Sequence, residues 1–195
     1  SEASQMAAEG KELYETTGSA GFTGGSCWVN ELSVTSTYMT EEGLLSVVAE
    51  NYTYYGGAHP NSVSRTWSFD LTTGEFLTLD ALSSEEGNIN GDSLQTSIYQ
   101  NIVSQIDSQG LSEAYFDDYD SYLSDFPAFA TFYFTATGMT VAFDTYIIAP
   151  YAAGPQVFDV PYSVFYSALN ERAKTLLEVP QEQIVLSDFD TAATL

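Results

Sequence analysis

The chain has 195 residues, 44% of them hydrophobic and 14% aromatic, so it can bury a core and is not a disordered chain. Only four basic side chains oppose 27 carboxylates, and the formal net charge of −23 repels nucleic-acid phosphate and anionic lipid while it attracts cations or a basic protein. The sequence contains no run of about 18 apolar residues and no signal-peptide pattern, so we expect membrane attachment only through a removed N-terminal anchor.

Apolar and polar residues alternate in the first third of the chain, after an expected helical start at residues 1–12 and a glycine-rich loop. The alternation predicts three strands, at Leu32–Met39, Gly43–Tyr55 and Ser62–Leu71. In the third of these, Trp67 and Phe69 share one face, opposite to Asp70. A glycine-containing turn then leads into a short predicted strand at residues 76–82.

The period then changes to that of an amphipathic helix. Apolar residues recur every four positions, at Leu94, Ile98, Ile102 and Ile106. Asp92 or Ser93 can cap the start of this helix, and Gly110 follows its end. A second, shorter helix is expected over residues 111–126, stopped by Pro127.

The last third of the chain returns to sheet. Strands are expected at residues 128–136 and 139–146, on either side of a glycine-containing tight turn. Val157–Pro161 predicts a short edge strand, and a helix with proline at its first position is predicted over residues 161–174. This order of elements indicates an α+β fold, in which antiparallel sheets are covered by helices in two packed subdomains.

His59 is the only histidine of the chain, which makes it the first candidate for catalysis. A histidine acts as a general base when a carboxylate orients it, and Asp70 and Glu50 are on neighbouring predicted strands. This pattern alone does not select either carboxylate.

The segment around His59 also has a structural interpretation. Gly56 and Gly57 permit a positive φ or a close approach of the backbone, and Pro60 holds the residue before it extended. We therefore interpret Gly56, Gly57 and Pro60 as a backbone motif. Tyr54 and His59 remain candidate ligand contacts.

A second candidate contact region is the loop "APYAAGP". Pro150 and Pro155 stiffen this loop, which lowers the entropy cost of binding. Tyr151 can serve as an amphipathic anchor for a partner. Gly154 is assigned to the backbone structure of the loop. The alternative to a ligand contact is that the whole loop is only a rigid connector between strand and helix.

The sequence predicts no catalytic residue, no metal site and no cofactor. It contains no G-x-S-x-G motif, and a lone histidine with the lone Cys27 cannot form a zinc site. Residues 86–97 approximate a calcium loop, but the twelfth residue is Ser97 rather than glutamate. The acidic segment Phe116–Asp125 is interpreted as a solvated helix face, with weak binding of a cation or a basic partner as the alternative.

Three stretches together resemble one family. They are "YTYYGGAHPN" (Tyr52–Asn61), "FDLTTGEFLTLDAL" (Phe69–Leu82) and "VAFDTYIIAPYAAGPQVFDVPYS" (Val141–Ser163). The chain is similar to a bacterial extracytoplasmic domain of unknown function that is shared by the anti-sigma factor RsiV, a lysozyme receptor, and the N-terminal region of the peptidoglycan deacetylase PdaC.

The resemblance implies an extracellular, cell-surface or periplasmic bacterial domain in two parts, residues 1–76 and 77–195. It also implies a non-catalytic binding or sensing role in the cell envelope, toward a basic protein such as lysozyme or toward peptidoglycan fragments. Two alternatives stay open: an enzyme that acts on envelope glycans through His59 and a carboxylate, and a purely structural accessory module of a lipoprotein.

Overall fold

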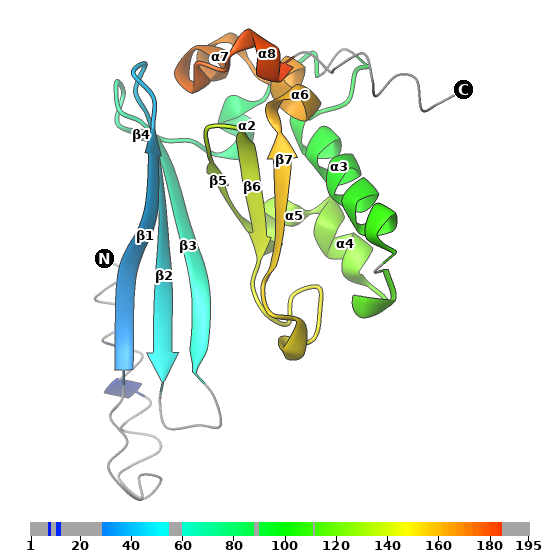
Figure 1. The fold of residues 1–195 in the computed structure, drawn as a ribbon. Helices are drawn as coiled ribbons and strands as arrows, with labels where there is room; N and C mark the ends of the chain where they lie inside the picture. Colours follow the sequence, from blue (N-terminus) through cyan, green and yellow to red (C-terminus); the bar gives the residue numbers. More distant parts are fainter. Residues whose placement is uncertain are drawn as a thin grey trace, which may run out of the picture. The chain divides into compact units, whose positions relative to one another are not determined.

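The computed structural model describes residues 8, 11–12, 29–54, 60–87, 90–110 and 112–184. Within these ranges it confirms the α+β class, with two antiparallel sheets and several helices (Figure 1). The strands are β1 (Val29–Met39), β2 (Leu44–Tyr54), β3 (Asn61–Asp70), β4 (Glu75–Phe76), β5 (Thr131–Phe134), β6 (Gly138–Phe143) and β7 (Gln156–Pro161). The helices are α2 (Leu79–Leu82), α3 (Leu94–Gln109), η2 (Ser112–Ala114), α4 (Tyr119–Ser124), α5 (Phe126–Phe129), η3 (Tyr151–Ala153), α6 (Tyr162–Phe165), η4 (Tyr166–Ala168), α7 (Glu171–Leu177) and α8 (Gln181–Ile184).

The chain groups into two compact units. One comprises Ser1–Thr35 with Ala49–Arg65, and the other comprises Ser36–Val48 with Thr66–Leu195. In the first unit, the Ser62 hydroxyl of β3 donates a hydrogen bond to the Glu50 carboxylate of β2. The expected division into residues 1–76 and 77–195 stays a prediction.

The four-stranded sheet has the order β1-β2-β3-β4, and β4 pairs with only the last two residues of β3. The predicted strand at residues 76–82 is wrong beyond Phe76. The Thr78 hydroxyl accepts a hydrogen bond from the Ala81 N–H at 3.2 Å, which caps a helix instead of continuing a strand. This helix, α2, buries Leu79 and Leu82.

The polar face of β3 is the buried face at its C-terminal end. Ser68 and Asp70 are buried, whereas Trp67 is only half-buried. The hydroxyls of Ser68 and Ser46 are 2.9 Å apart, and the Ser46 hydroxyl also accepts from the backbone N–H of Phe134 at 3.0 Å. These hydrogen bonds offset the desolvation cost of burying Ser46 and Ser68 in the core.

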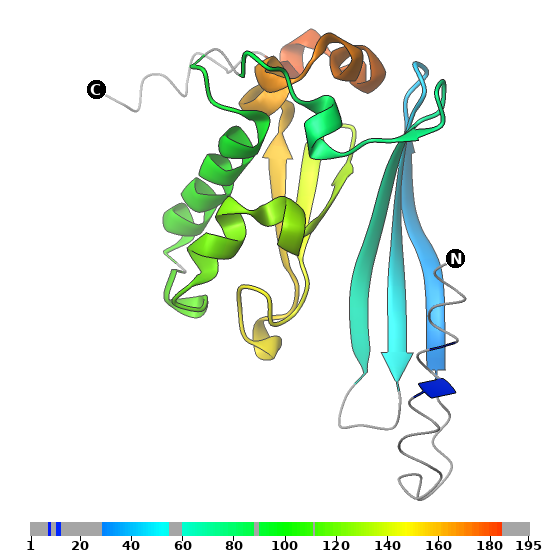
Figure 2. The same cartoon turned by 180° about the vertical axis from the view of Figure 1, so that it is seen from behind.

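The second sheet has the order β5-β6-β7 and carries the main core. Helix α3 contacts β7, α4 and α6, and Figures 1 and 2 show it alongside this sheet. The predicted apolar stripe of α3 is confirmed as buried, at Leu94, Ile98, Ile102 and Ile106. Ser93 caps the helix by accepting from the Thr96 N–H, and Gly110 ends it with a φ of 63°.

Two other predicted helices are interrupted. The helix expected over residues 111–126 is divided among η2, α4 and α5, and Pro127 does not stop it but occupies the first turn of α5, where its missing N–H has no intrahelical partner to lose. The helix expected over residues 161–174 is divided among α6, η4 and α7. Asn170 causes this break, because its Oδ1 accepts from the Ala173 N–H while its Nδ2 donates to the carbonyls of Ala81 and Ser83.

Helix α7 also holds the β1–β2 turn. The side chain of its C-cap residue, Glu178, accepts from the backbone N–H groups of Glu41 at 2.7 Å and Glu42 at 3.3 Å. The Thr40 hydroxyl donates to the carbonyl of Leu176 at 2.6 Å. These contacts fix the turn to α7 from both sides.

Candidate functional site

Asp70 forms an ion pair with Arg172. The N–H and hydroxyl of Thr72 donate to its Oδ1 at 2.8 and 2.5 Å, and Arg172 donates to its Oδ2 through Nε and Nη2 at 2.9 and 2.5 Å. The Thr72 hydroxyl and then Arg172 hold the pKa of Asp70 at about 2, against the penalty of burial. A carboxylate with four donors and so low a pKa is a poor general base near neutral pH.

The structure describes only some residues of the segment around His59. Gly56, Gly57 and His59 lie outside the described residues. Tyr54 ends β2 and Pro60 precedes β3, and both are half-buried. Their role as a ligand contact or a backbone motif stays a prediction.

The loop of residues 144–155, which we call the aromatic loop, is anchored at several points. Ile148 and Ala149 are buried, and the Ile148 carbonyl accepts from the Phe116 N–H at 3.0 Å. The Gln156 side chain donates to the carbonyls of Ala153 and Gly154 and accepts from the Tyr115 hydroxyl at 3.1 Å. The loop is thus held in one conformation by its base and by its C-terminal end.

The predicted contact residues lie at the exposed part of this loop. Pro150 is the N-cap of η3, Tyr151 begins it, and Gly154 ends it with a φ of 71°. Pro150 and Pro155 are exposed, and Tyr151 is half-buried. The structure therefore brings these four residues together around one turn of 3-10 helix.

Tyr146 is the residue of the loop that sequence reasoning missed. Its ring is 5.4 Å from that of Tyr151, and the residue is 60% exposed. Its φ of 70° places a bulky side chain in the left-handed region, which costs about 1–3 kcal/mol of strain. The Ile147 N–H donates to the Asp144 carbonyl, and the turn that this bond closes imposes the positive φ on Tyr146. The sequence does not predict it, because glycine or asparagine is usual at this position of a turn.

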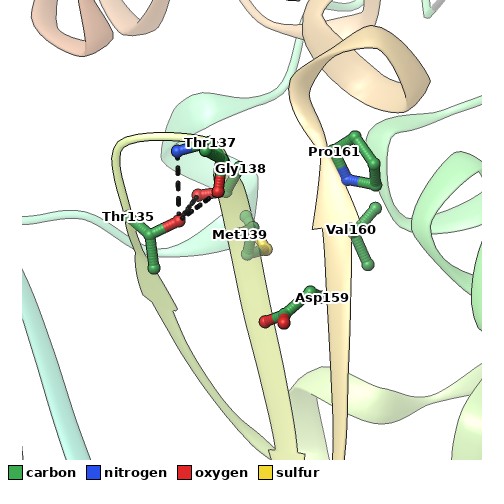
Figure 3. Close-up of a pocket in the computed structure, with 7 residues that line it drawn as sticks. All are labelled: Thr135, Thr137, Gly138, Met139, Asp159, Val160 and Pro161. Carbon is green, nitrogen blue, oxygen red and sulfur yellow. Dashed lines mark hydrogen bonds between the residues drawn. The ribbon is translucent and has the colours of Figure 1, made fainter.

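A small pocket of about 130 Å³ lies where the β5–β6 turn meets the end of β7 (Figure 3). Asp159 is the charged residue of its lining and accepts from the Thr140 hydroxyl at 2.6 Å. The Thr135 hydroxyl donates to the carbonyl of Gly138 and accepts from the Thr137 N–H, both at 3.3 Å. These bonds stabilise the turn itself, and we assign no ligand to this pocket.

A larger pocket of about 200 Å³, which we call the Trp67 pocket, lies at the edge of β3. Nine residues line it, including the aromatic side chains of Trp67, Phe76 and Phe132. Pro127 of α5 is also part of the lining. Sequence alternation places Trp67 on a strand face, but Phe132 joins it only through the tertiary fold.

Among the described residues, no group of three or more His, Cys, Asp or Glu side chains is arranged to hold a metal ion. The helices in the described ranges include none with both the length and the apolar character needed to cross a membrane.

The fold has relatives among solved structures. A DUF3298 family protein from Pseudomonas aeruginosa PAO1 is 17% identical with a TM-score of 0.53, over 75% of this chain and 64% of that one. A member of the same family from Bacteroides fragilis NCTC 9343 is 19% identical with a TM-score of 0.56, over 86% of this chain and 64% of that one. The chain thus spans less than two thirds of either protein, and the likeness concerns the fold.

No curated protein matches the chain significantly. Residues 88–163 match the family model described as "Protein of unknown function (DUF3298)". This range contains the aromatic loop and the small pocket, and it contributes Pro127 and Phe132 to the Trp67 pocket. The expected likeness to a domain of unknown function is therefore confirmed, with DUF3298 as the matching family over residues 88–163.

Proposed function

We propose that this chain is a non-catalytic, extracytoplasmic binding or sensing domain of the bacterial cell envelope, and that its aromatic loop contacts a basic protein. The observation that carries the proposal is the exposed Tyr146 ring, held on strained backbone against the ring of Tyr151. Strain of this kind persists at sites where a side chain must be presented in one orientation. Tyrosine is also the side chain most suited to anchoring a protein interface at low entropy cost.

The charge of the chain supports a cationic partner. The formal net charge is −23, and within the described residues Arg172 pairs with Asp70 and Lys174 pairs with Glu171. The acidic residues Asp117 and Asp118 directly follow Phe116, whose N–H is bonded to the base of the aromatic loop. A lysine or arginine of a partner can therefore meet an aromatic face close to carboxylates, which favours cation–π contact and fast association.

The resemblance to the lysozyme receptor RsiV makes lysozyme the first basic protein to test. Titration calorimetry at low salt is expected to give saturable binding that weakens as salt screens the attraction. Tyr146→Ala and Tyr151→Ala should each weaken it about thirtyfold, the effect of losing a central aromatic anchor. Phe129→Ala is the matched control, because Phe129 is an exposed aromatic residue outside both the loop and the Trp67 pocket, and its loss should leave affinity unchanged.

The outcomes separate the alternatives. No heat with lysozyme at low salt, or equal losses in the loop variants and the control, would refute the basic-protein proposal. Turnover of peptidoglycan that is lost in a folded His59→Ala variant would establish the enzyme alternative instead. A chain with neither ligand nor turnover would fit the structural accessory module of a lipoprotein.

A further inference from the structure

We infer that the Trp67 pocket binds one uncharged sugar ring. The pocket forms because β4 is too short to cover β3. Strand β4 pairs with Phe69 and Asp70, and the Leu77 N–H that follows it bonds to the Ser68 carbonyl at 2.8 Å. The edge of β3 at Thr66 and Trp67 therefore borders a cavity instead of another strand. Pro127 of α5 and Phe132 of β5 also line this cavity.

The aromatic side chains supply flat apolar surfaces. Phe76 is 56% exposed, and its ring packs on Phe69, directly across the strand pair, at a centroid distance of 4.4 Å. Trp67 is half-buried on β3 and also faces the cavity. A pyranose ring presents C–H groups on its faces, and these pack on aromatic rings by dispersion.

The hydroxyl groups of the lining argue against a purely apolar ligand. The Thr66 hydroxyl has no hydrogen-bond partner among the described residues. The Thr78 hydroxyl accepts from the Ala81 N–H, which leaves its own proton to be donated. An apolar group in the pocket would cover these hydroxyls without pairing them, whereas sugar hydroxyls would satisfy both.

The charge of the lining and the volume of the pocket narrow the choice of ligand further. None of the nine lining residues is charged, although the chain contains 27 carboxylates. A volume of about 200 Å³ is also below the roughly 300–1,000 Å³ of pockets for drug-sized ligands. The lining therefore suits one neutral ring rather than a charged group or an acyl chain.

The test uses the trisaccharide of N-acetylglucosamine as the probe. The chain has two tryptophans, so Trp28→Phe leaves Trp67 as the only fluorophore of that kind. We expect a saturable change in Trp67 emission with a Kd of about 1 mM, as suits a single bound ring. A trigalacturonate, whose pyranose rings each carry a carboxylate, should cause no change.

Two variants assign the binding to the pocket. Phe76→Ala should weaken binding about tenfold through the lost ring contact, and Thr66→Val about fivefold through one lost hydrogen bond. Thr66→Val preserves shape, so it remains informative if Phe76→Ala fails to fold. Thr137→Val, in the small pocket, and Tyr146→Ala, in the aromatic loop, should bind the probe normally.

The Trp67 pocket shares no residue with the aromatic loop, so either proposal can fail while the other holds. No emission change and no heat with the trisaccharide would overturn the sugar site. Unchanged affinity in both pocket variants would also overturn it. Binding of N-acetylphenylalaninamide in place of the sugar would show that the pocket accepts the side chain of a protein partner.

Discussion

Gly138→Ala is expected to destabilise the second sheet severely, because β7 approaches this residue too closely for a side chain. A Cβ at Gly138 would overlap the carbonyl oxygen of Val160, and it would lie 2.9 Å from that carbonyl carbon and 3.0 Å from the Cα of Pro161. All three are backbone atoms, so no side chain can rotate away. The strands β6 and β7 would have to separate at the pair Gly138–Pro161.

The magnitude follows from this geometry. Overpacking usually costs 1–3 kcal/mol, and a clash with the backbone of a paired strand belongs at the upper end, about 3 kcal/mol. For a chain of this length, each kcal/mol lowers the Tm by about 2–4 °C, so the loss should be roughly 6–12 °C. Gly110→Ala is the matched control: its φ of 63° costs about 1 kcal/mol, but its Cβ would meet no atom within 4 Å.

Thermal melting followed by circular dichroism, with urea unfolding as a second measure, would test the difference. We expect Gly110→Ala to lose only about 2–4 °C. If Gly138→Ala melted with the parent chain, or if both variants lost the same amount, close approach of β7 would not be the reason for a glycine at this position.

Three further predictions concern polar groups that hold elements together. The pKa of Asp70 lies at about 2, below its ordinary value of 3.8, so Asp70 stabilises the fold fully above about pH 4 and loses this effect as the pH falls toward 2. In Asp70→Asn, the midpoint of urea unfolding should therefore change less with pH over this range. Asn170→Ala should cost about 2–3 kcal/mol in urea unfolding, whereas Asn170→Asp, which keeps the cap on α7 but loses both amide donors, should lose about half of that. Burial raises the pKa of Tyr162 above the ordinary 10.0, so stability should fall as the pH rises above about 10, and the fall should be shallower in Tyr162→Phe; an equally steep fall in that variant would contradict this assignment.

The elements that could be predicted from the sequence are those with strong local signals. Helix α3 carries an uninterrupted apolar stripe between Ser93 and Gly110, so both its face and its ends were predictable. The breaks in the later helices were not, because they depend on distant residues. The Asn170 N–H bonds to the Leu82 carbonyl at 2.9 Å, and the Asn170 side chain reaches the same turn.

The candidate sites likewise have some features that could be predicted from the sequence and others that could not. Proline and tyrosine in the aromatic loop were visible as a stiff segment with an aromatic anchor. The exposure of Tyr146 and its unusual φ follow from a turn whose residues carry no glycine signal. Likewise, Trp67 and Phe76 are near neighbours in sequence, but Phe132, which also lines their pocket, joins them only through the tertiary fold.

The buried Ser46 hydroxyl has a consequence for how this chain behaves in a crowded solution. Strand β5 is at an edge of its sheet, and an edge strand presents backbone groups that can pair with a strand of another molecule. At Phe134 the N–H is occupied by Ser46, which is fixed in turn by Ser68. The molecule thereby blocks one of its own aggregation-prone edges with a side chain from the neighbouring sheet, without using a charge or a proline on β5.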